Sequence, residues 1–148
     1  MDGIQINGNK KFVFQTKKAL RVLKSKSSAT YTRVVLKYVK KIKSHKISGM
    51  NVFARVPTYE VGIPTAFESL KWYASTIAHD AYHSKLYFDY KKKHKRSVPR
   101  RVYAGVRAEL ICIKFQIKVG RKIGLAGSKI KYLKTLDGSH AKFRKITW

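Results

Sequence analysis

Carboxylates, cysteine and proline are all scarce in this sequence of 148 residues. Seven Asp and Glu residues stand against 34 Lys and Arg residues, which gives a formal net charge of +27. The single cysteine, Cys112, excludes an intrachain disulfide framework and a zinc finger built on cysteines. No apolar run approaches the roughly 18 residues that a membrane-spanning helix needs. The first residues lack the basic-then-apolar order of a signal peptide, which predicts a cytoplasmic protein.

Hydrophobic residues are plentiful enough for a buried core. They make up 44% of the chain, and aromatic residues make up 12%, so disorder is excluded and one domain over residues 1–148 is predicted. The excess of positive charge indicates an anionic partner, which would be nucleic acid, an anionic surface or an acidic protein.

The spacing of apolar residues predicts a mainly helical chain. We expect long helices over residues 10–24, 29–42, about 65–93 and 102–123, and a short helix over 128–136. Short strands are expected over residues 4–6, 51–56 and 59–61, and a basic, extended tail after the last helix. The helix over 102–123 is apolar over a wide arc, so it should be buried against the helix over 70–93. The predicted fold class is α+β: a mainly helical single domain with a central pair of buried helices and a few short strands.

A histidine pair in the helix over 65–93 is the strongest candidate for chemistry. His79 and His83 are four residues apart, so both imidazoles lie on one helix face and can bind one metal ion. Asp80 directly follows the first histidine, where the His-Glu-x-x-His pattern of metallopeptidases has its general base. The sequence therefore predicts His79 and His83 as metal ligands and Asp80 as a catalytic carboxylate.

A catalytic zinc site needs a third protein ligand. The acidic candidates are Glu60, Glu68, Asp89, Glu109 and Asp137. Glu109 is favoured because it lies in the most apolar helix, where an unpaired carboxylate would be costly. Two alternatives stay open: that the histidine pair is a coincidence of surface or packing, and that Glu109 pairs with one of the many lysines and arginines.

The residues around this motif resemble a known family. They are the run from Trp72 to Tyr87, then Val98-Pro99, Val102-Tyr103, Gly105, Ala108-Glu109 and Cys112. The chain is similar here to small metallopeptidase-like domains found at the C-termini of bacterial Rhs or YD-repeat polymorphic toxins and as stand-alone bacterial proteins. The similarity extends from Ile4 to His140. It implies zinc held by His79, His83 and Glu109, with Asp80 in the base position.

The resemblance also implies a function. A zinc-activated water would attack the peptide bond of a protein or peptide substrate, in a domain of the toxin or effector type. The protein would be either cytoplasmic or a delivered effector, and its positive surface would bind nucleic acid or an acidic immunity protein. A toxin that acts on nucleic acid through the same metal site is a further alternative.

The densest positive run follows the histidine helix. It comprises Lys91, Lys92, Lys93, Lys95, Arg96, Arg100 and Arg101. Such a run provides contacts to phosphates, and the nearby Tyr87, Phe88 and Tyr90 are either stacking residues or, as we favour, core residues. The alternative function is accordingly a non-catalytic, basic nucleic-acid-binding protein with structural histidines.

Overall fold

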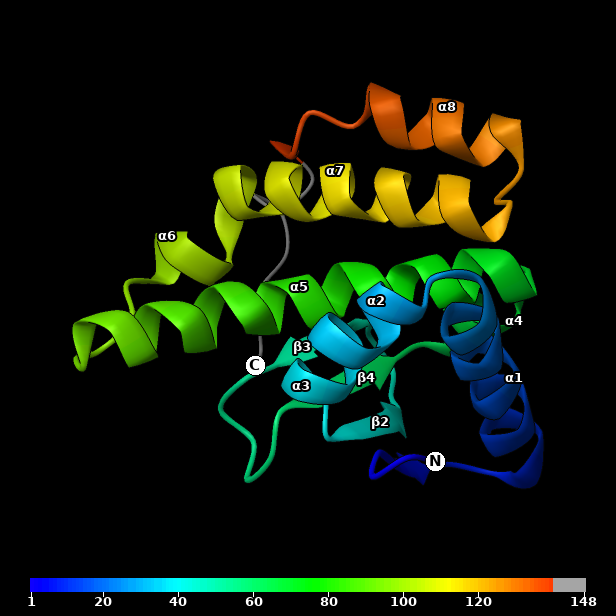
Figure 1. Ribbon diagram of the computed structural model, residues 1–148, viewed down its shortest axis with the longest axis horizontal. Coiled ribbons are helices and arrows are strands. Elements are labelled where there is room, and N and C mark those ends of the chain that lie inside the picture. The colour runs from blue at the N-terminus through cyan, green and yellow to red at the C-terminus, as the bar shows by residue number, and fades with distance from the viewer. Residues whose placement is uncertain (140–148) are drawn as a thin grey trace.

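Helices dominate the computed structural model, which describes residues 1–139, and a small sheet lies on one side of them (Figure 1). The first half of the chain contains β1 (Gln5–Asn7), α1 (Lys10–Lys26), α2 (Ser28–Thr30), a π-helical turn (Tyr31–Val35), α3 (Leu36–Tyr38), β2 (Lys41–Ser44), β3 (Gly49–Asn51) and β4 (Thr58–Val61). The second half contains α4 (Ile63–Glu68), α5 (Leu70–His94), α6 (Arg100–Tyr103), α7 (Gly105–Ile123) and α8 (Gly127–Thr135). The predicted α+β class is confirmed.

The sheet has four strands in the order β1-β2-β4-β3. The β1–β2 and β2–β4 pairs are parallel, and β3 pairs antiparallel with β4. Ile42 and Tyr59 are opposite one another in β2 and β4, and both are fully buried. The Tyr59 hydroxyl donates a hydrogen bond to Oγ1 of Thr76 at 3.1 Å, which ties the sheet to α5.

The long helix α5 begins and ends at clear signals. Ser69 separates it from α4, and its side chain caps α5 by accepting a hydrogen bond from the backbone N–H of Trp72 at 3.1 Å. The last residue of the helix is His94, and Lys95 after it has a left-handed backbone with φ of +50°. No helix in residues 1–139 is long and apolar enough to cross a membrane.

The pair of α5 and α7 forms the centre of the molecule, as predicted (Figure 1). The two helices run antiparallel. Ser75, near the start of α5, accepts a hydrogen bond from Gln116 in the second half of α7. Further along α5, two successive turns place His79 and His83 against Glu109 near the start of α7. The interface between the two helices therefore carries a row of polar groups inside an otherwise apolar core.

Three predictions about local structure are wrong. The helix predicted over residues 29–42 ends at Tyr38, because Ile42 pairs with β1 and β4 instead of continuing the helix. The strand predicted over 51–56 ends at Asn51, whose side chain accepts hydrogen bonds from the next turn. The helix predicted over 102–123 is broken at Ala104, which has an extended backbone and is followed by Gly105 with φ of +82°. The predicted extended tail lies mostly in residues 140–148, outside the described residues.

Candidate metal centre

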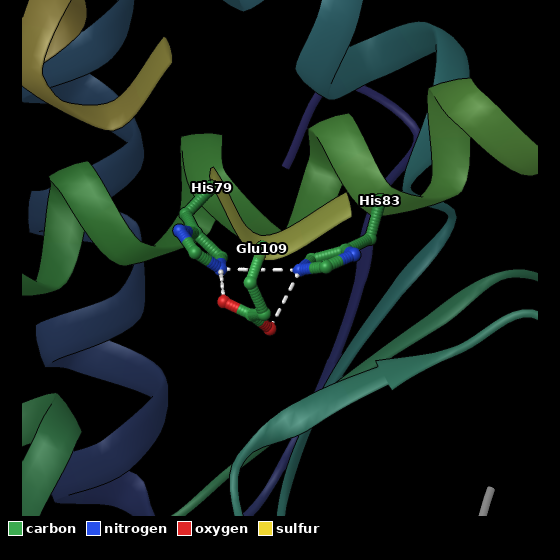
Figure 2. Close-up of side chains that lie close together, drawn as sticks. All are labelled: His79, His83 and Glu109. Atoms are coloured by element: carbon green, nitrogen blue, oxygen red, sulfur yellow. Dashed lines mark hydrogen bonds and ion pairs between the residues drawn. The ribbon is translucent and has the colours of Figure 1, made fainter. Parts of the chain in front are cut away.

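His79, His83 and Glu109 converge at the interface of α5 and α7, as Figure 2 shows. Nε2 of His79 is 3.2 Å from one carboxylate oxygen of Glu109, and Nε2 of His83 is 3.1 Å from the other. The two Nε2 atoms are 3.1 Å apart. All three side chains are largely buried, with exposed side-chain fractions of 14%, 7% and 9% respectively. Two nitrogens and a carboxylate thus face one small space.

These separations fit a metal ion of the size of zinc. Four ligands at about 2.0–2.1 Å from a tetrahedral zinc ion lie about 3.3 Å from one another. Each histidine contacts a different oxygen of Glu109, and one ligand atom from each of the three residues lies within 4.8 Å of the others. The His79, His83 and Glu109 group could therefore hold a metal.

His83 is oriented by the break between α6 and α7. Its Nδ1 donates a hydrogen bond to the backbone carbonyl of Tyr103 at 2.7 Å. Tyr103 is the last residue of α6, so its carbonyl has no partner from a continuing helix. With its proton on Nδ1, His83 would present the Nε2 lone pair to a metal bound beside His79 and Glu109, which is the usual way in which metal-binding histidines are oriented.

His79 makes its polar contacts through one nitrogen. Its Nδ1 is buried and has no hydrogen-bond partner among the described residues, whereas Nε2 contacts both Glu109 and His83. The ring is therefore held by its neighbours in the group and by packing, with a centroid distance of 5.0 Å to the His83 ring.

The charges of the group depend on one another. Burial alone would raise the pKa of Glu109, but hydrogen bonds from His79 and His83 hold it well below its usual range. Burial alone would lower the pKa of His83, but Cys112 and Glu109 raise it well above its usual range. Because burial also raises the pKa of the Cys112 thiol, that group is neutral, and the Glu109 carboxylate is the charge that keeps a proton on His83. Because an imidazole must lose the proton on its ligating nitrogen to bind a metal, metal binding at this group would release protons.

An open cavity of about 340 Å³ lies beside the group. His79, Asp80 and Glu109 line it, together with polar residues from the sheet side and apolar residues of α5, α7 and α8. Asp80 is only 9% exposed. The carboxylate that the motif places in the base position thus shares a cavity with two of the three candidate ligands.

The other acidic candidates have partners elsewhere. Glu60 contacts His45 and Asn51, Glu68 pairs with Lys129, Asp89 pairs with Lys85, and Asp137 accepts a hydrogen bond from the N–H of Ser139. Among the described residues, Glu109 is the acidic residue that the structure places with His79 and His83.

The predicted positive run is spread over the end of α5, the loop after it and α6. All seven residues are exposed: Lys91, Lys92, Lys93, Lys95, Arg96, Arg100 and Arg101. Tyr87 is buried, as favoured from the sequence, and Phe88 and Tyr90 are half-buried. Sequence reasoning missed the Tyr103 carbonyl and the exposed Phe53, a residue that packs edge-on against the rings of Tyr87 and Tyr103.

Comparisons with family models, with curated proteins and with solved structures find no match to this chain. The resemblance to metallopeptidase-like domains stays a prediction.

Proposed function

We propose that this protein is a zinc-dependent hydrolase of the metallopeptidase-like type. The observation that carries the proposal is the convergence of His79, His83 and Glu109, with ligand atoms within 4.8 Å of one another, beside an open cavity that Asp80 also lines. Catalytic zinc sites use three protein ligands of this kind and leave one position open. Two histidines and one carboxylate also suit Fe(II), so the identity of the metal is part of the test.

Each residue at the site would have a distinct role in hydrolysis. His79, His83 and Glu109 would bind the ion, and the Tyr103 carbonyl would keep the Nε2 lone pair of His83 directed at it. Zinc in such a site makes water acidic and polarises the carbonyl group of a substrate. Asp80 would accept the proton of the attacking water and return it to the leaving nitrogen of the peptide. Because aspartate is one methylene shorter than glutamate, Asp80 must come closer to the water or act through a second water.

Substitution of Asp80 tests this mechanism. Asp80→Asn should keep zinc and lose hydrolysis of a fluorogenic peptide library, because the ligands are untouched but the proton acceptor is gone. Asp80→Glu should keep or raise the activity. Asp89→Asn is the matched control, since Asp89 lies on the same helix but pairs with Lys85.

Three results would contradict the proposal. One is that the zinc-loaded wild-type protein hydrolyses no peptide in the library. Another is that Asp80→Asn leaves both zinc binding and hydrolysis unchanged. A loss of zinc affinity by about 10- to 100-fold without a specific loss of turnover would show that Asp80 only supports the ligands.

The toxin or effector role is proposed from the sequence resemblance alone. Expression in the bacterial cytoplasm should then slow growth, and His79→Ala should relieve the effect. Equal growth inhibition by both proteins would point to the positive charge as its cause and would contradict this role.

A further inference from the structure

A second cavity lies at the far end of α5, where the helix ends in its positive run. It has a volume of about 480 Å³ and is lined by two aromatic residues, Phe53 and Tyr87, by three cations, Lys91, Lys95 and Arg96, and by the loop residues after them. This volume lies within the range of pockets that bind small molecules, about 300–1,000 Å³. The cavity has no lining residue in common with the cavity beside the candidate metal group.

Phe53 is a fixed but exposed ring. The side chain of Asn51 accepts hydrogen bonds from the N–H groups of Phe53 and Ala54, at 3.1 and 3.0 Å, which fixes the turn. The ring packs edge-on against Tyr87 and Tyr103, with centroid distances of 5.5 and 5.8 Å. Yet Phe53 is 58% exposed. Because neighbouring rings already hold the Phe53 ring in place, little conformational entropy is lost when a flat ligand stacks on its free surface.

The cations at this cavity are available to an anion. Lys91, Lys95 and Arg96 are exposed, and none of them forms an ion pair within residues 1–139. Arg96 donates a hydrogen bond to the Tyr90 hydroxyl at 3.0 Å, which places its guanidinium beside the cavity without neutralising it. The C-terminal end of a helix carries a partial negative charge of only about half a unit, which these residues and their neighbours Lys92 and Lys93 outweigh. The cavity is therefore strongly positive.

We propose that this cavity binds a nucleotide unit of single-stranded nucleic acid. The base would stack on Phe53, and the phosphates would contact Lys91, Lys95 and Arg96. Single strands expose the faces of their bases, whereas in a duplex the bases stack on one another. An acidic peptide would use the cations but has no planar base for the exposed ring. The site shares no lining residue with the cavity beside the metal group, although Phe53 packs on Tyr103, whose carbonyl contacts His83, and it goes beyond the proposed hydrolase activity.

The chain provides a matched control patch on α1. Phe14 is a second exposed aromatic residue, at 63%, and Lys18 lies over its ring with Nζ 5.5 Å from the centroid. Lys17 and Arg21 are exposed on the same helix. A set of one phenylalanine and three cations can thus be removed there with the same change in composition and charge.

The experiment measures binding of a fluorescent oligothymidylate of about 12 nucleotides by anisotropy at several salt concentrations. Phe53→Ala should weaken binding by about 5- to 150-fold, the effect of losing one stacked base, while Phe14→Ala should change it little. Phe53→Trp should restore binding. The triple change of Lys91, Lys95 and Arg96 to Gln should flatten the dependence of log K on log salt by about 2, more than the triple change of Lys17, Lys18 and Arg21. Thermal melts establish that each variant is folded.

Several outcomes would overturn the proposal. Equal effects of the two patches would mean that only the overall charge binds the strand. If Phe53→Ala weakened the binding of a duplex of the same length by the same factor, base stacking on Phe53 would not contribute to binding. A polyglutamate peptide could bind with the same affinity as the oligonucleotide and keep that affinity in Phe53→Ala. This result would assign the cavity to acidic proteins. Zinc content measured on the same samples keeps this result separate from the proposed hydrolase, because it shows whether the loss of the Phe53 contact to Tyr103 also disturbs the metal group.

Discussion

The Glu109 carboxylate is predicted to stabilise the fold even without metal. In Glu109→Gln the amide keeps the shape of the side chain but loses the charge that both histidines contact at 3.1–3.2 Å. Breaking a buried ion pair costs about 3–5 kcal/mol, and because the amide keeps one hydrogen-bond acceptor we expect a loss of about 3 kcal/mol. For a chain of this length, that loss lowers the Tm by about 6–12 °C.

Melting curves followed by circular dichroism, with a chelator present, measure this loss. The control is Glu68→Gln, since Glu68 and Lys129 are both partly exposed and such a pair is worth at most about 1 kcal/mol. Zinc at about one hundred times its Kd should stabilise the wild type by about 2.7 kcal/mol, and Glu109→Gln should lose most of this gain. If Glu109→Gln costs no more than Glu68→Gln, the idea that the carboxylate is the buried partner of both histidines is refuted.

Two further predictions concern other titratable groups. Burial alone would raise the pKa of Asp89, but hydrogen bonds from Lys85 and Tyr38 lower it. The ionised Asp89 therefore stabilises the folded protein at pH values above the pKa that this residue has in the unfolded chain, and this stabilisation is lost as the pH falls. Asp89→Asn should therefore cost about 1 kcal/mol at neutral pH in urea unfolding and progressively less below about pH 4; a cost that does not change with pH would contradict this assignment. Cys112 is fully buried and burial raises the pKa of its thiol, so the folded protein should resist a thiol reagent such as DTNB and react fully once unfolded. Rapid labelling of the folded protein would show that the thiol is accessible.

The central part of the candidate site could be predicted from the sequence because it depends on helical spacing. His79 and His83 share a face by their separation of four residues, and Glu109 is conspicuous as a carboxylate in an apolar helix. The Tyr103 carbonyl that orients His83 could not be predicted, because a backbone group leaves no trace in the sequence. The break at Ala104 that frees this carbonyl lies in a segment whose apolar spacing is compatible with an unbroken helix.

Pairing between distant segments accounts for the other misses. Val39 and Ile42 continue the apolar spacing of the preceding helix, yet residues 41–44 pair with β1 and β4, and this tertiary pairing outweighs local periodicity. The positive run is visible in the sequence, but Phe53 comes from a turn about forty residues earlier and joins the run only in the folded structure.

The central claim is that His79, His83 and Glu109 bind one zinc ion, and elemental analysis tests it most directly. Protein purified without metal-affinity columns should contain one zinc per chain by plasma mass spectrometry. His79→Ala, His83→Ala and Glu109→Ala should each lose it while remaining folded, and His45→Ala should keep it, because His45 pairs with Glu60 away from the group. A wild-type protein without bound metal, whose Tm is unchanged by zinc or by chelator, would contradict the claim, and stoichiometric iron in place of zinc would contradict the proposed identity of the metal.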